Sequence, residues 1–131
     1  MRSRLLAVVA LAVSMCAADA MRKAPKPPDL EVLAASARHN EDRISLDGRV
    51  RNTGEKAISS LTLAFDFLDS DGTLLTTQKN AIDEELLEPG KEAVFRFEVD
   101  APPRAIKVRI NAFDGNEREL RVAKAGPFVI D

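Results

Sequence analysis

The 131-residue chain contains no Trp and no Tyr, and only one Cys and one His. Without Trp or Tyr it has few of the flat aromatic surfaces on which sugars and nucleic-acid bases stack. The single Cys, Cys16, cannot form a disulfide within the chain, so the stability of the folded part has to come from its core. His39 lies in a polar segment without the nucleophile or further ligands that a catalytic or metal site requires, which favours an exposed loop position.

Charge of one sign is not in excess either. The chain has 19 basic and 21 acidic residues, and two Arg and one Asp lie in the first 20 positions, so residues 21–131 carry a net charge of 17 − 20 = −3. This balance argues against a nucleic-acid groove or an anionic membrane surface as the main partner. The sequence also has no glycine-rich phosphate loop, no nucleophile elbow and no His-rich metal motif. We therefore predict no cofactor, no metal site and no catalytic residues.

The longest apolar run lies near the N-terminus, where a basic start is followed by the apolar residues 5–13. Ala18-Asp19-Ala20 then supplies a small-x-small cleavage site. This pattern is typical of a secretory signal peptide, here residues 1–20, with cleavage between Ala20 and Met21. A retained membrane anchor is the alternative, but the run is well short of the roughly 20 residues that span a bilayer. The predicted location is secreted or periplasmic.

Cys16 leaves a second interpretation open, in which the protein is a lipoprotein anchored through that residue. Lipoprotein cleavage requires a small residue directly before the Cys, and Met15 stands there instead, so this is the weaker alternative. The following residues 21–28 contain three Pro and three basic residues, which predicts an extended linker or an ordinary flexible N-terminus.

From residue 29 onward, apolar residues recur with a period of two, which indicates β-strands. The clearest strand is 61–67, where alternate residues are Leu or Phe and the opposite face is mostly polar. Asp69-Ser70-Asp71-Gly72 predicts a hairpin turn, since Gly adopts positive φ without steric cost. The Thr-rich segment 73–79 returns as a shorter strand. The other predicted strands are 30–34, 44–50, 93–99, 106–110 and 118–123.

Seven short strands separated by turn residues predict an all-β fold, an immunoglobulin-like antiparallel β-sandwich over residues 29–131. Gly48 stands where its strand pattern requires an apolar side chain, which indicates a bulge or a close approach between sheets. Helical periodicity is confined to the short segment 81–87. The residues predicted to face the core are Leu61, Leu63, Phe65, Phe67, Phe95, Phe97, Ile106, Val108 and Ile110.

Several of these features resemble the FxLYD domain, an immunoglobulin-like module of exported prokaryotic proteins. Phe65, Phe67 and Asp69 occupy the Phe, Leu and Asp positions of the name motif, while Leu68 replaces its Tyr. The resemblance covers about residues 44–113 and implies a β-sandwich and an exported setting, but no activity and no site residues. The other matching positions are the run 48–54, Ile58, Gly72, Pro89-Gly90 and the run 95–97.

Two acidic groups are candidates for a function. Asp66, Asp69 and Asp71 are one candidate for Ca²⁺ binding, which requires 6–8 oxygen ligands. The alternative, which we favour, is that Asp69 and Asp71 stabilise the turn by accepting hydrogen bonds from nearby backbone N–H groups. The run 83–88 holds four carboxylates that either dock a basic partner or, as is more usual, form a solvated loop. Paired carboxylates for glycoside hydrolysis would lack aromatic support for a sugar.

The sequence thus predicts a non-catalytic exported module, structural or for protein interaction, and not an enzyme. The exposed edge of the strand 73–79 is the predicted contact for another envelope or extracellular protein, by strand addition. Neither nucleic acid nor a membrane span after signal cleavage is expected. The alternatives are a lipid-anchored envelope protein using Cys16 and, with less support, a small metal-dependent enzyme, which would need polar groups converging in a pocket.

Overall fold

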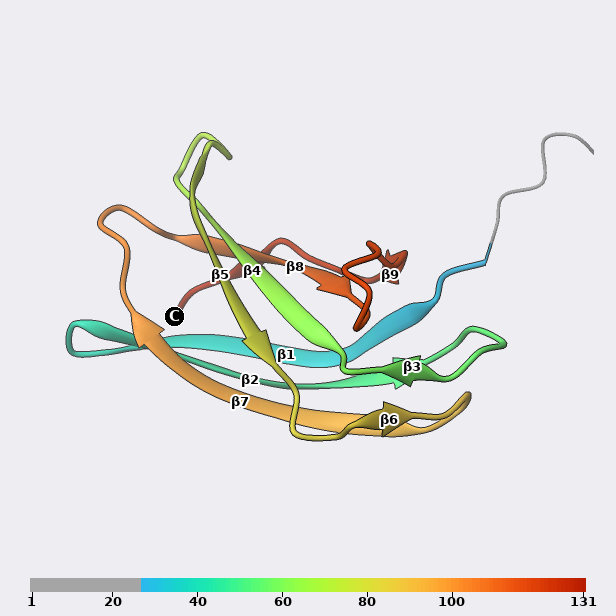
Figure 1. Cartoon of the computed structure of the whole chain (residues 1–131). Helices are drawn as coiled ribbons and strands as arrows, with labels where there is room; N and C mark the ends of the chain where they lie inside the picture. Colours follow the sequence, from blue (N-terminus) through green and yellow to red (C-terminus); the bar gives the residue numbers. More distant parts are fainter. Residues whose placement is uncertain (1–26) are drawn as a thin grey trace, which may run out of the picture.

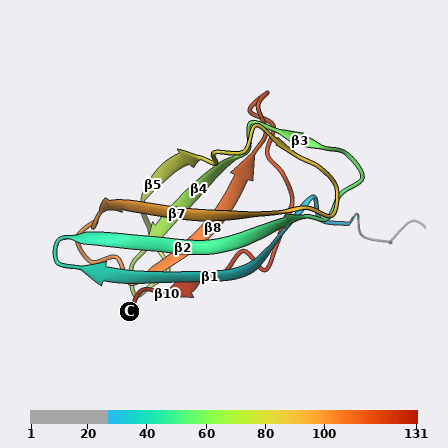
Figure 2. The same ribbon diagram turned by 90° about the horizontal axis from the view of Figure 1, so that it is seen from below.

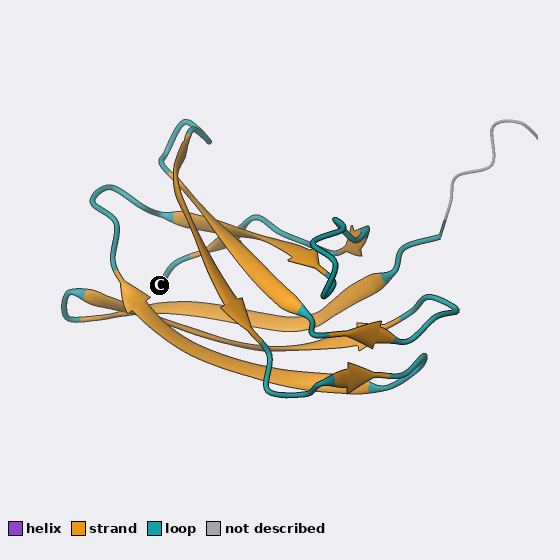
Figure 3. Ribbon diagram, viewed as in Figure 1, coloured by secondary structure: helices purple, strands orange, loops and turns teal. Residues whose placement is uncertain are grey.

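The computed structural model describes residues 27–131, and every regular element in this range is a β-strand (Figures 1 and 3). The predicted signal peptide, Cys16 and most of the predicted linker lie outside the described residues. Between residues 27 and 131 there is no helix that could cross a membrane. The strands are β1 (Leu30–Asn40), β2 (Arg43–Asn52), β3 (Ile58–Ser59), β4 (Thr62–Leu68), β5 (Leu74–Ala81), β6 (Leu86–Leu87), β7 (Glu92–Asp100), β8 (Lys107–Phe113), β9 (Val122–Ala123) and β10 (Phe128–Val129).

Two four-stranded sheets face each other, with the order β7-β2-β1-β9 in one and β10-β8-β4-β5 in the other. Figure 1 shows β4, β5 and β8 crossing obliquely over β1, β2 and β7, and Figure 2 shows the latter three side by side. This order corresponds to immunoglobulin strands A, B and E against G, F, C and C′. The predicted β-sandwich is therefore confirmed. One pairing departs from the antiparallel expectation, because β9 runs parallel to β1.

The core between the sheets is built around phenylalanine rings. Phe65 lies 5.8 Å from both Phe95 and Phe97, measured between ring centroids, and Phe65, Phe67 and Phe95 are buried as predicted. Phe97 is only partly buried. The prediction for Ile106 is wrong, since 40% of this residue is exposed. It precedes β8 at the end of the sandwich, where its backbone is bonded but nothing covers its side chain.

The close approach predicted at Gly48 is present, but within one sheet rather than between sheets. A Cβ atom at this position would lie 2.3 Å from the Ala34 carbonyl oxygen and 2.4 Å from the Phe95 ring. The accompanying bulge is in β1, where the register with β2 shifts between Val32 and Ala34. Because the bulge reverses the alternation, Ala37 is buried and Ala34, predicted to share the inner face with Val32, is exposed.

The strand β4 differs from the half-buried strand that its alternation predicts. Its outer-face residues Ala64, Asp66 and Leu68 are as inaccessible as its Leu and Phe side chains. The cause is its central position, because β4 pairs with β5 on one side and β8 on the other. The longer side chains of these neighbours cover the short residues of β4.

The C-terminal segment seals one lateral side of the sandwich. It donates backbone hydrogen bonds to one sheet from Leu120 and Ile130, and to the other from Asp131, which bonds to Ala37. The strand predicted at 118–123 is accordingly reduced to β9, and β10 follows, because the segment alternates between the two sheets. On the opposite lateral side, β5 and β7 are the terminal strands of their sheets.

The segment 81–87, with its helical periodicity, is not a helix. Its last residues form β6, which pairs with β3 so that Leu87 lies opposite Ile58 and both are buried. The spacing of Ile82 and Leu87 therefore reflects two separate contacts with the core and not one face of a helix.

Candidate functional site

The strand β5 is a terminal strand of its sheet, and one edge of its backbone pairs with no other strand. The backbone N–H of Ile82 donates to the Leu61 carbonyl, just beyond the last residue of β5. Counting back from this bond along the register with β4, the backbone groups of Asn80 and Gln78 are the ones that bond to β4. Because backbone groups alternate in direction along a strand, the N–H and C=O groups of Thr77 and Lys79 point away from the sheet. Both residues are exposed, as the strand prediction for 73–79 requires of an edge.

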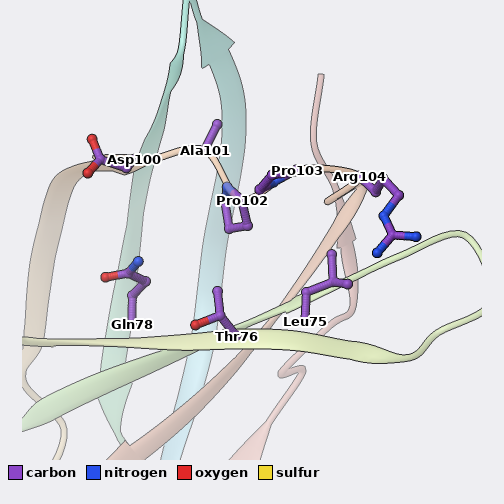
Figure 4. Close-up of a pocket in the computed structure, with 8 residues that line it drawn as sticks. All are labelled: Leu75, Thr76, Gln78, Asp100, Ala101, Pro102, Pro103 and Arg104. Atoms are coloured by element: carbon purple, nitrogen blue, oxygen red, sulfur yellow. The ribbon is translucent and has the colours of Figure 1, made fainter.

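A groove of about 480 Å³ lies beside this edge, on the interior side of β5. The side chains of Leu75, Thr76 and Gln78 point from β5 toward the segment 100–104, which connects β7 to β8 (Figure 4). Ala101 and Pro102 contribute apolar surface on the far side, while the β5 side is mostly polar. Asp100 and Arg104 are the charged residues of its lining, and Thr76 and Gln78 supply the polar groups on the β5 side.

The other free edge on this side, β7, is protected by charge. The register with β2 and the bond from Asn52 to Lys91 direct the backbone groups of alternate β7 residues outward. Four of these positions carry ion-paired side chains, and the remaining one is Val94, which is 70% exposed. Charged residues at an edge discourage further strand pairing. The ion pairs are Arg49–Glu92 at 3.4 Å, Asp47–Arg96 at 2.9 Å, Arg43–Glu98 at 3.3 Å and Arg43–Asp100 at 3.1 Å.

Asp66 anchors β5 from the outer face of the sheet. One carboxylate oxygen accepts a hydrogen bond of 2.7 Å from the Thr77 hydroxyl, and the other accepts one from the Asn111 amide. Arg109 lies 3.6 Å from the same carboxylate. A buried carboxylate is tolerated when it is bonded on every side. These contacts tie the edge strand to β4 and β8, so that β5 presents a fixed edge.

The candidate calcium ligands are not brought together. Asp69 accepts backbone hydrogen bonds from Asp71 and Thr73, which is the turn-stabilising role that we favoured, while Asp66 is occupied on the outer face of the sheet. His39 is exposed as predicted, but it lies in strand β1, opposite Ile44, and not in a loop. Over residues 27–131, no three His, Cys, Asp or Glu residues lie close enough to hold a metal ion. The acids of the run 83–88 are exposed.

A second, larger hollow of about 870 Å³ lies at the end of the sandwich where the described chain begins. One residue of its lining, Asn52, was predicted only as part of a turn. It is fully buried, donates to the carbonyls of Lys56 and Leu87, and accepts from the Gly54 N–H. Sequence offers only a weak signal for this role, a polar residue at an inward position of a strand.

Across the same hollow, the backbone N–H groups of Arg118 and Asn116 donate to Asp114. These hydrogen bonds, chiefly the one from Arg118, lower the pKa of the Asp114 carboxyl. Hydrogen bonding to the charged form of an acid has this effect. The bonds close the turn after β8, and the charges around the hollow are mixed, so its chemistry points to no particular ligand.

No family model matches the chain, and no curated protein matches it. Among solved structures, the C-terminal domain of Wzt is 12% identical, with 78% of both chains covered and a TM-score of 0.51. A β-glucuronidase of glycoside hydrolase family 2 is 10% identical over 78% of this chain, with a TM-score of 0.50. IrmA from Escherichia coli is 14% identical over 80% of this chain and 99% of its own, with a TM-score of 0.49.

The chain spans only 12% of the length of a Bacteroides uniformis β-glucuronidase that it also matches, and 13% of the family 2 enzyme. The likeness to the Wzt domain and to the family 2 β-glucuronidase supports the β-sandwich fold alone. It says nothing about activity.

Proposed function

We propose that this protein is a non-catalytic exported module that binds an extended segment of another envelope or extracellular protein by strand addition to β5. The observation that carries the proposal is the outward-facing, exposed backbone of Thr77 and Lys79 at a free sheet edge. Main-chain hydrogen bonds supply the affinity in such complexes, and pockets beside the edge supply specificity. The groove between β5 and the segment 100–104 is such a pocket.

Two further features favour strand addition at β5 over addition at β7. The Asp66 contacts hold the strand in place, which lowers the entropy lost on binding. The paired charges along β7 disfavour addition there. The proposed non-enzymatic role draws support from the scattered placement of the carboxylates and of His39.

Export and the FxLYD relationship are part of the same proposal and rest on the sequence. The motif positions have structural roles that suit a scaffold, since Phe65 and Phe67 lie in the core and Asp69 closes the hairpin. Leu68, which replaces the Tyr of the motif, is buried on the outer face of β4. A β-sandwich stabilised in this way needs no disulfide.

The test is capture of partners from envelope extract with wild-type protein, Thr77→Pro and Thr77→Ala. Proline at this position removes an N–H that points outward, whereas both variants lose the hydroxyl bonded to Asp66. Partners that bind wild type and Thr77→Ala but not Thr77→Pro support the proposal. Identical partner profiles for all three proteins would rule out binding by strand addition to β5. A Thr76→Pro variant is unsuitable, because the Thr76 backbone points toward β4.

The bait is purified from cells that express the whole chain, and its intact mass is recorded first. We expect a mature protein that begins at Met21 and carries no acyl group. A mass showing an acylated N-terminus at Cys16 would replace the secreted form with the lipid-anchored alternative and leave the β5 test unchanged. Equal melting temperatures of the two Thr77 variants would show that proline has not unfolded the edge.

A further inference from the structure

The outer face of the β5 sheet has an unbalanced charge. Lys79, Lys107 and Arg109 lie on this face, because they are opposite the outward residues Ala64, Leu68 and Asp66 or share their rows. Asp66 is the one acid on the same strands, and it is buried and bonded to Thr77, Asn111 and Arg109. In the other sheet, by contrast, several outer charges of β2 and β7 are paired with one another.

Lys79 is the basic residue at the free edge. Its ammonium lies 4.7 Å from the centroid of the Phe113 ring, a cation–π contact that keeps it on the outer face. Among residues 27–131 it has no carboxylate partner within ion-pair distance. A strand added to β5 would place one of its own residues directly opposite Lys79 and on the same face, because paired residues share a face of the sheet.

The charges flanking β5 are of the opposite sign. Asp69 and Asp71 lie in the hairpin before the strand, and the acidic residues 83–85 follow it. An added strand with acids near its ends would therefore meet like charges, whereas an acid at its centre would meet Lys79. The neighbouring residues of the added strand lie on the inner face, and the one opposite Gln78 is beside the groove, whose far wall includes Ala101 and Pro102.

On the basis of the proposed function, we infer that the partner segment is an extended strand with a carboxylate at its centre, opposite Lys79, and small apolar residues on either side. The central acid would pair with Lys79, its two neighbours would lie on the inner face, and the one opposite Gln78 would face the groove. We expect the partner segment to run antiparallel to β5, because all the other pairings of this sheet are antiparallel.

The test uses three capped seven-residue peptides built on Thr-Thr-Val-X-Val-Thr-Thr, with Glu, Thr or Lys at X. Each is titrated into ¹⁵N-labelled protein, and the dissociation constant is taken from the amide shifts of β5. We expect the order Glu, Thr, Lys from tightest to weakest, with about twofold to fivefold between steps, the range measured for cross-strand charge pairs. Lys79→Glu should reverse this order. Lys91→Glu, which makes the same charge change away from β5, should keep it.

The outcomes separate the two claims. Equal affinity of the three peptides for wild type, with loss of all binding in Thr77→Pro, would overturn the inferred partner chemistry and leave strand addition standing. Binding that is unaffected by Thr77→Pro would overturn strand addition itself. A titration in which none of the peptides shifts the β5 amides would count against both.

Discussion

The two free edges on the open side of the sandwich, β5 and β7, differ in the side chains that surround their unpaired backbone groups. Both have a row of backbone groups that no neighbouring strand satisfies. Along β7, four of the five outward positions carry ionic side chains that are paired with β2, the exception being Val94. At the equivalent positions β5 has one ionic residue, Lys79, between Thr77 and Ala81. An edge that is left this weakly protected invites pairing. This difference is the reason why we propose that binding takes place on β5.

The inward faces of the two strands differ as well, and this gives the largest expected effect. Phe95 on β7 is 3% exposed and packs on Phe65, whereas Gln78 on β5 faces the groove and is only half-buried. Phe95→Ala should lower the free energy of unfolding by about 3–5 kcal/mol, as expected for removing a buried ring. Gln78→Ala should change it by no more than about 0.5 kcal/mol.

Urea denaturation of the two variants measures this contrast, read from the midpoint at constant m-value. Equal losses of stability would mean that β5 contributes to the core as β7 does. In that case the comparison between a structural edge and a binding edge would fail.

A smaller loss of stability than that of Phe95→Ala is expected from removing the protection of β7. Replacing Glu92, Arg96 and Glu98 with Thr breaks exposed ion pairs, each of which contributes about 1 kcal/mol or less. The variant should nevertheless gain a second pairing edge. Sedimentation velocity should show self-association that wild type lacks.

A matched control removes two acids and one base elsewhere on the exposed surface. The variant Glu84→Thr, Glu85→Thr, Lys56→Thr makes the same net charge change at exposed residues outside β7. It should remain at the wild-type oligomeric state. Association of both triple variants would assign the effect to net charge and not to the edge.

Alternation along the chain was sufficient to predict the fold class, most long strands and the core around Phe65. It could not show that β4 is covered on both faces, because burial of Ala64 and Asp66 depends on side chains of neighbouring strands. The sequence pattern also did not predict the bulge in β1. Ala34 continues the apolar alternation, although the register of β1 with β2 has already shifted at this residue. Such features arise from pairing between distant segments.

For the candidate site, the sequence predicted the edge strand but not what makes it distinctive. The polar residues on both faces of the segment 73–79 indicated an exposed strand. The contrast with β7 required the pairing of Arg43 and Arg96 with distant carboxylates. The burial of Asn52 and Asp66 likewise depended on hydrogen bonds across the fold.

The most direct test of the central claim is amide hydrogen exchange along β5, measured with and without the bound partner or the Glu-centred peptide. In the free protein, the amides of Gln78 and Asn80 should exchange slowly and those of Thr77 and Lys79 rapidly, because only the first pair bonds to β4. On binding, Thr77 and Lys79 should become protected as well. Protection of Thr77 and Lys79 in the free protein, or its absence in the complex, would contradict the account.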